Sequence, residues 1–406
     1  MRTHHSLRVL VTILSLSYGC VSDCFSQVVA SDLRTVFPNI FAEEDFSVLL
    51  QGEPIVKLMS ASDRREIAVA GMVRLQVPAE TFLTSYQQNM TRKNAAAILE
   101  IGAFTDPPSV NNLDTLTIDD RDLDDLKSCT VGDCRLKLSA SMIERFQKEV
   151  DWQAPDYRLK ATQLYKQMLV EYVQNYLSRG EVALIHYDDK SQTLDLNSET
   201  QRLLRTSSYR AIVDSTLGSK EPEKFSSVDH RIVWSKVKFG LKPVISINHI
   251  SISKTADKVL ILAKQLYANH YFESSVGLTA YFAAAGANPE SYLYYENHSL
   301  LDGFGGPFGK IKRGLVEDGA IDGLKSFLSN SQAGLNARNL NPAGATSTSV
   351  IGNQTSRRSR IGKVHFILFL IWIAALVTMI RAYGWKLKSK RRKSALANAS
   401  NPANQG

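Results

Sequence analysis

Histidine is the side chain best suited to proton transfer and metal binding near neutral pH, and the chain holds eight of them. None belongs to an HExxH or HxH motif, the spacings that bring two imidazoles to one metal ion. His186 and His249 fall in expected strands, where a hydrogen-bonded structural histidine is the alternative to a catalytic one. We therefore predict no catalytic residue and no metal site from the histidines. The six outside the extreme N-terminus are His186, His230, His249, His270, His298 and His365.

Motifs for nucleophilic catalysis and phosphate binding are missing as well. The chain has no G-x-S-x-G nucleophile turn, no G-x-x-x-x-G-K loop and no G-x-G-x-x-G fingerprint. The glycine-rich segment 303–309 lacks the Lys-Ser/Thr pair of a phosphate loop, so we interpret it as a bend. We predict no cofactor. A hydrolase with scattered catalytic residues stays open as an alternative.

Two cysteines, Cys129 and Cys134, lie outside the N-terminal leader described below. Their spacer, Thr-Val-Gly-Asp, is a turn sequence, and in an oxidising compartment such a pair most simply forms a local disulfide. A metal site would need a second pair of ligands, and a redox site normally uses a two-residue spacer. Both remain alternatives to the disulfide.

The two ends of the chain carry targeting signals. Residues 1–30 combine basic Arg2 and Arg8 with an apolar run and small residues at 28–30, which predicts a signal peptide. Residues 364–380 contain no formal charge, and we place a transmembrane helix at 364–383. The basic tail that follows, 384–406, indicates a cytoplasmic C-terminus. We therefore expect a single-pass protein of the cell membrane, with an exported domain at 31–330 and a flexible linker at 331–363.

The formal charge of +8 would by itself suggest a partner rich in phosphate. Residues 331–406, however, contain twelve Lys or Arg and no Asp or Glu. The exported part is therefore mildly acidic, and we reject nucleic acid as its partner. The membrane is the expected partner of the tail, with acidic lipid head groups as a minor addition.

Between the ends, the sequence predicts an α+β fold. Period-two alternation and β-branched residues indicate strands, and apolar residues at helical spacing indicate helices. A largely helical insertion is expected at about 105–205, and residues 206–236 give only weak signals. The expected strands are 54–59, 66–77, 182–187, 244–252, 259–267, 271–282 and 292–297. The expected helices include 79–90, 93–101 and a long C-terminal helix at 307–328.

This order of elements resembles the helix-grip fold of the START-like, polyketide-cyclase-like superfamily. The resemblance rests on the strand 66–77, the Pro78-Ala-Glu-Thr-Phe82 turn into a helix, the meander and the closing helix. It implies a curved antiparallel sheet around the C-terminal helix, with an apolar cavity between them. Segments 238–246 and 292–299 also resemble secreted bacterial proteins that have no assigned activity.

Two neighbouring strands of the meander supply the candidate binding residues. Alternation places each set on one face of its strand, and we expect both sets to face the same side. The predicted function is the binding or carriage of an apolar small molecule or lipid. A tethered protein-interaction or structural module is the alternative if the final helix fills that space. The candidates are Val259, Ile261, Ala263 and Tyr267 on one strand, and Phe272, Val276, Leu278, Ala280 and Phe282 on the next.

Overall fold

A computed structural model describes residues 33–340, apart from 38, 62, 94–96, 218–227, 256–257, 284–289 and 305–308. The expected signal peptide, transmembrane helix and basic tail lie outside the described residues. Within the described ranges, no helix combines the length and apolarity needed to cross a membrane.

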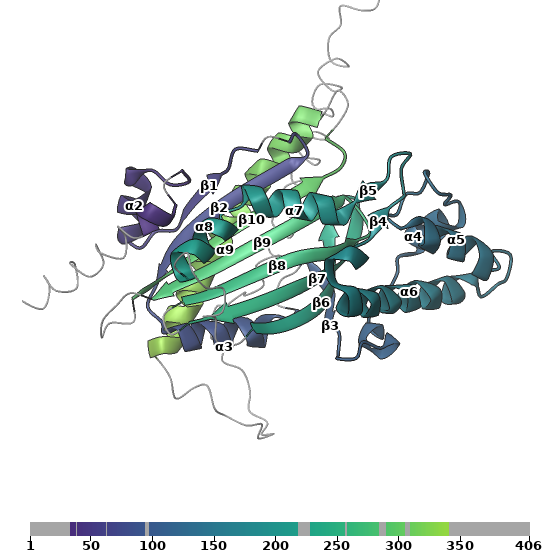
Figure 1. Cartoon of the computed structure of the whole chain (residues 1–406), viewed down its shortest axis with the longest axis horizontal. Helices are drawn as coiled ribbons and strands as arrows, with labels where there is room; N and C mark the ends of the chain where they lie inside the picture. The colour runs from purple at the N-terminus through teal and green to yellow at the C-terminus, as the bar shows by residue number, and fades with distance from the viewer. Residues whose placement is uncertain are drawn as a thin grey trace, which may run out of the picture.

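An eight-stranded, fully antiparallel, curved sheet forms the centre of the fold (Figure 1). The predicted meander supplies its middle, and the β6–β7 hairpin turns through Gly240, whose positive φ of 59° suits glycine. In spatial order the strands are β1 (Ile55–Leu58), β2 (Glu66–Leu75), β10 (Ser291–Leu301), β9 (Phe272–Ala283), β8 (Lys258–Ala268), β7 (Lys242–Lys254), β6 (Val228–Phe239) and β3 (Ile98–Ala103).

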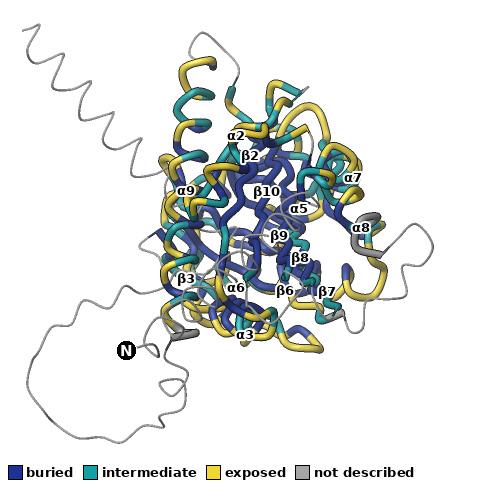
Figure 2. The backbone as a smooth tube through the Cα atoms, turned by 90° about the vertical axis from the view of Figure 1, so that its left-hand side faces the viewer, coloured by how far each residue is buried: buried dark blue, intermediate teal, exposed yellow. Residues whose placement is uncertain are grey.

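Helices cover both faces of this sheet (Figures 1 and 2). The long helix α9 (Gly309–Leu340) packs along β2 and β1, and α3 (Ala79–Asn89) contacts α9, β8 and β9. We call the sheet face beneath α9 and α3 the helix-grip face. The opposite face is covered by α2 (Glu43–Leu50), α7 (Leu196–Thr206) and α8 (Tyr209–Leu217).

The region between β3 and β6 builds a second core against the end of the sheet. It contains α4 (Asp120–Lys127), α5 (Ala140–Glu149), α6 (Tyr157–Arg179), the 3-10 turns η1 (Val110–Leu113) and η2 (Gly180–Ala183), and the small β4 (His186–Tyr187) and β5 (Leu194–Asp195) pair. These helices bury Trp234 and Ile247 of the sheet. The hydroxyl groups of Tyr165 and Tyr267 lie 2.7 Å apart across this contact.

Glycine is required where α9 crosses β2. A Cβ atom on Gly71 would lie 2.7 Å from Leu328 Cδ1 and 2.9 Å from the Ile55 carbonyl oxygen. The helix therefore approaches β2 more closely than any side chain there would permit. Leu324 and Leu328 fill the contact and are buried.

Several predicted elements differ from the structure. The helix expected at 93–101 is wrong, because 98–103 forms β3 and pairs with β6. Strand β6 lies largely in the region of weak signals, since each of its faces mixes apolar and charged residues. Of the strand expected at 182–187, only the two residues of β4 form a strand, and they follow η2 in the sequence. The final helix continues to Leu340, so the first ten residues of the expected linker are helical.

Candidate functional site

The expected binding residues do not face one common side of the sheet. In the β8–β9 pairing, Val259 lies opposite Tyr281 and Ala263 lies opposite Gly277. Val259, Ile261 and Ala263 therefore share the helix-grip face with Tyr281 and Gly277. The expectation that both strand sets face the same side is wrong, because alternation within a strand does not fix its register against the next strand. Val276, Leu278, Ala280 and Phe282 lie on the opposite face.

The opposite face is filled by the protein's own side chains. The Phe37 ring stacks on Tyr294 with 4.1 Å between centroids and meets Phe282 edge-on at 6.2 Å. Leu278 and Ala280 belong to the same buried cluster, and Val276 packs with Leu203 of α7. These candidates are core residues of a packed layer.

The two remaining candidates lie near the end of the sheet. Tyr267 belongs to the second core, where its hydroxyl meets Tyr165 and the Lys137 carbonyl oxygen. Phe272 is buried on the helix-grip face, with its ring centroid 4.9 Å from that of Phe239. A register shift in β8 beside Ile247 separates Tyr267 from the face of Val259.

The helix-grip face carries a group of small polar side chains in the middle of an otherwise apolar core. The strand pairings set Ser246 opposite Ser235, Gln265 opposite Asn248, and Ser299 opposite Ser275. All of them are buried. We call this group the polar patch. It consists of Ser235, Ser246, Asn248, Gln265, Ser275, Thr279, Asn297 and Ser299.

Hydrogen bonds within the polar patch satisfy part of its polar atoms. Ser299 Oγ donates to Asn297 Oδ1 at 2.8 Å and lies 2.7 Å from Ser275 Oγ. Asn248 Nδ2 donates to Ser246 Oγ at 3.3 Å. Asn248 Oδ1 is buried and has no hydrogen-bond partner among the described residues. Leaving such an acceptor unsatisfied costs about 1–3 kcal/mol.

Apolar side chains surround the polar patch on the same face. Four of them are buried in the hydrophobic core on the helix-grip face: Val259 and Ile261 of β8, Ile250 of β7 and Tyr295 of β10. The main contacts of α9 fall on β1, β2 and α3, at the side of the sheet away from Asn248. Apolar walls around a few uncharged polar groups can hold a molecule that has an apolar body and a polar group.

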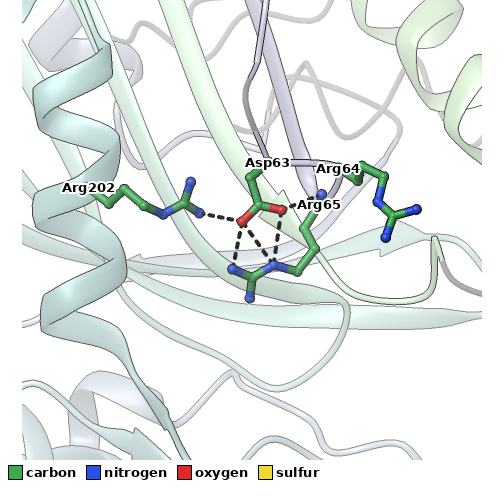
Figure 3. Close-up of a pocket in the computed structure, with 4 residues that line it drawn as sticks. All are labelled: Asp63, Arg64, Arg65 and Arg202. Atoms are coloured by element: carbon green, nitrogen blue, oxygen red, sulfur yellow. Dashed lines mark hydrogen bonds and ion pairs between the residues drawn. The ribbon is translucent and has the colours of Figure 1, made fainter.

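A second candidate is a surface pocket of about 520 Å³ lined by Asp63, Arg64, Arg65 and Arg202 (Figure 3). The turn before β2 supplies the first three residues and α7 supplies the fourth. Figure 3 shows the Asp63 carboxylate between two guanidinium groups. Its Oδ2 lies 2.7 Å from Arg65 Nη2 and 3.1 Å from Arg202 Nη2. The hydrogen bond from Arg65 holds the pKa of Asp63 below its usual value.

Behind this pocket, a buried imidazole bridges two carboxylates. His298 Nδ1 lies 2.7 Å from Glu66 Oε1, and Nε2 lies 2.5 Å from Glu296 Oε1. Burial alone would lower the pKa of His298, but the hydrogen bonds to Glu296 and Glu66 raise it to about 9. Both ring nitrogens therefore carry protons near neutral pH and are already paired. The ring cannot act as a general base, and it ties β10 to β2.

Other histidines also have structural partners. His270 Nε2 lies 3.1 Å from the buried Asp122 carboxylate, and the exposed His186 lies 3.5 Å from Asp195. Burial, with Lys264 and His230 nearby, lowers the pKa of His249 to about 4. His365 lies outside the described residues.

In the part of the chain that the structure describes, no three His, Cys, Asp or Glu side chains are arranged for a metal ion. The two cysteines instead pair with each other, with the sulfur atoms of Cys129 and Cys134 2.03 Å apart. Their loop is closed further by hydrogen bonds between the backbones of Thr130 and Asp133. The disulfide closes this turn, and both cysteines pack against the second core.

Comparisons with protein-family models, with curated proteins and with solved structures find no match.

Sequence reasoning missed the polar patch, although a signal for it is visible. Ser246 and Asn248 alternate with isoleucines in β7. In β10, Asn297 and Ser299 are two positions apart, so they lie on the same face of that strand.

Proposed function

We propose that the exported domain binds a small amphipathic molecule or lipid against the helix-grip face of the sheet. The observation that carries the proposal is the polar patch in the interior between the sheet and its helices. An interior that served only for packing would favour apolar side chains there, because burying polar groups is costly unless each is paired.

Asn248 Oδ1 and both polar atoms of the Gln265 side chain are buried without hydrogen-bond partners among the described residues, and they support a ligand with hydrogen-bonding groups. A hydroxyl or amide group of the ligand would satisfy Asn248 Oδ1 and offset its desolvation cost. No member of the polar patch carries a formal charge, so an ionised head group would remain uncompensated there. An uncharged polar group on an apolar body is therefore the chemistry that fits best.

The surrounding wall supports an apolar body for the ligand. Val259 and Ile261 are two of the candidates predicted from sequence, and they lie on the same face as the polar patch. With Ile250 and Tyr295 they offer aliphatic and aromatic surface. Burial of apolar area contributes about 25 cal/mol per Å², so such a body would supply most of the affinity.

The sequence supports the further proposal that the domain works next to a membrane. The expected signal peptide, linker and transmembrane helix would hold it at the outer face of the bilayer. A tethered binding domain could take up a lipid from that bilayer or present a bound molecule to a partner there. The resemblance to the helix-grip superfamily agrees with this role.

The test uses Gly277, which lies on the helix-grip face between Ala263 and Asn297. A Cβ atom there would have no neighbour closer than 3.6 Å, so Gly277→Leu accommodates its Cβ and projects its larger end over the polar patch. The full chain is purified, and the exported domain is released by a protease site inserted at 341–363. Bound molecules are then extracted and identified by mass spectrometry.

We expect the wild-type domain to release a stoichiometric small molecule and Gly277→Leu to release much less. Ala211→Leu adds the same side chain at an exposed position of α8 and should behave as wild type. Thermal unfolding of all three proteins checks that the variants are folded. A wild-type domain that carries nothing, or equal loading of both variants, would reject the proposal.

A further inference from the structure

Two histidines meet on the sheet face opposite the polar patch. His230 lies on β6 and His249 on β7, diagonally across the strand pair, since Ser251 is opposite His230 and Ile232 is opposite His249. His230 is exposed and His249 is half-buried beside the C-terminal part of α6. The two rings come together here even though nineteen positions separate them in the sequence.

The distance between the two rings is suited to a shared metal ion. His230 Nδ1 and His249 Nε2 lie 3.0 Å apart. Two imidazole nitrogens bound to one zinc ion at about 2.0–2.1 Å in tetrahedral geometry lie about 3.3 Å apart. A shift of a few tenths of an ångström, together with a rotation of the exposed His230 ring that turns both lone pairs towards one point, would therefore place both nitrogens in coordination distance of one ion.

The surroundings orient these nitrogens. The hydroxyl of Tyr176 lies 2.8 Å from His249 Nδ1 and leaves Nε2 directed at His230. A hydrogen bond to the second ring nitrogen is the usual support of a metal-binding histidine. Ser251 Oγ lies 3.2 Å from His230 Nδ1, and the exposure of His230 lets solvent complete a coordination sphere.

We propose that His230 and His249 form a two-histidine site for a divalent transition metal ion that prefers imidazole, such as Zn²⁺ or Cu²⁺. Without metal, the proton between the two neutral rings is bound to one of them and makes the hydrogen bond to the other. On metal binding, the ring that carries this proton changes tautomer: the proton moves to Nδ1 of His249, beside the Tyr176 oxygen, or to Nε2 of His230. Each ring keeps one proton, so no net proton is released.

The positive charge of Lys264 would oppose the binding of a metal cation, but Lys264 forms an ion pair with Glu181. The Lys264 ammonium lies 5.3 Å from the centre of the Tyr176 ring. The pair leaves little net charge beside the site. With only two protein ligands, the site should bind more weakly than a four-ligand structural zinc site.

The experiment titrates the full chain, purified without a histidine tag, with Zn²⁺ by calorimetry and with Co²⁺ by visible absorption. We expect one ion to bind in wild type and in His186→Ala, which removes an exposed histidine elsewhere. His230→Ala should lose that ion, and because its side chain is exposed this variant should fold. Mg²⁺, which prefers oxygen ligands, should not compete.

Tyr176→Phe separates coordination from a merely structural role of the histidines. It keeps both rings and should weaken Zn²⁺ binding about tenfold, the lower end of the effect of losing an outer hydrogen-bond partner. Unchanged Zn²⁺ stoichiometry and affinity in His230→Ala would overturn the proposal. Loss of binding in His186→Ala with retention in His230→Ala would overturn it equally.

Discussion

The charge on His298 should make the stability of the fold depend on pH. The ring is buried, and its hydrogen bonds to Glu296 and Glu66 raise its pKa from 6.5 to about 9. A group with a higher pKa in the folded state stabilises that state below its unfolded pKa, and this stabilisation is lost as pH rises through the folded pKa. We therefore expect the free energy of unfolding to fall between pH 6.5 and about 9.

The size of the fall follows from the two pKa values. One pKa unit corresponds to about 1.36 kcal/mol, so the difference for His298 is worth about 3 kcal/mol. This is a large part of the 5–15 kcal/mol that typically separates folded from unfolded domains. The effect should be visible without any mutation.

Urea unfolding of the released domain, followed by tryptophan fluorescence at pH 6.5 and pH 9, measures this difference. His298→Gln removes the titrating group and should remove most of the pH dependence. It should also lower stability at pH 6.5 by several kcal/mol, because Glu66 and Glu296 lose their buried cationic partner. His186→Gln, at an exposed site, controls for other histidines. An equal pH dependence in wild type and His298→Gln would show that His298 is not its cause.

Two further predictions concern packing and the cysteines. Gly71→Ala should destabilise the domain by about 1–3 kcal/mol, because its Cβ would lie 2.7 Å from Leu328 Cδ1. Gly277→Ala, with no neighbour within 3.5 Å of its Cβ, should change the urea midpoint little, and equal losses in both variants would contradict the account. Alkylation without reductant should leave Cys129 and Cys134 unmodified, and replacing both by serine should cost about 2 kcal/mol in urea unfolding by the chain-entropy relation. Two freely alkylated thiols would contradict the disulfide.

Local patterns were enough to predict the meander and the final helix. Residues 244–252 and 271–282 are rich in β-branched or alternating apolar side chains, and both became long strands. β6 escaped prediction because Lys236 interrupts its apolar alternation. Lys236 is buried, and its charge is compensated by an ion pair with Asp119, which lies more than a hundred residues away in the sequence. A partner so distant in sequence leaves no local signal.

The candidate site was predictable only in part, for a related reason. Alternation identified Val259 and Ile261 as one face of a strand, and that face does point towards α9 and α3. The relation of β9 to β8 depends on their register, which tertiary pairing sets. The polar residues Asn248 and Ser275 are visible in the sequence, but only the register shows that they share one face.

Native mass spectrometry of the released wild-type domain and of Asn248→Leu tests most directly whether a small molecule binds at the polar patch. Leucine has a similar size and removes the unpaired Asn248 Oδ1. It also removes the donor to Ser246 Oγ, which keeps its contact with Ser235 Oγ at 3.1 Å, so the thermal midpoint should change little. We predict that wild type carries a bound small molecule and that Asn248→Leu retains it about tenfold more weakly, as expected for the loss of one hydrogen bond of about 1.4 kcal/mol. Equal occupancy in the two proteins, or a wild-type domain with no bound mass, would contradict the account.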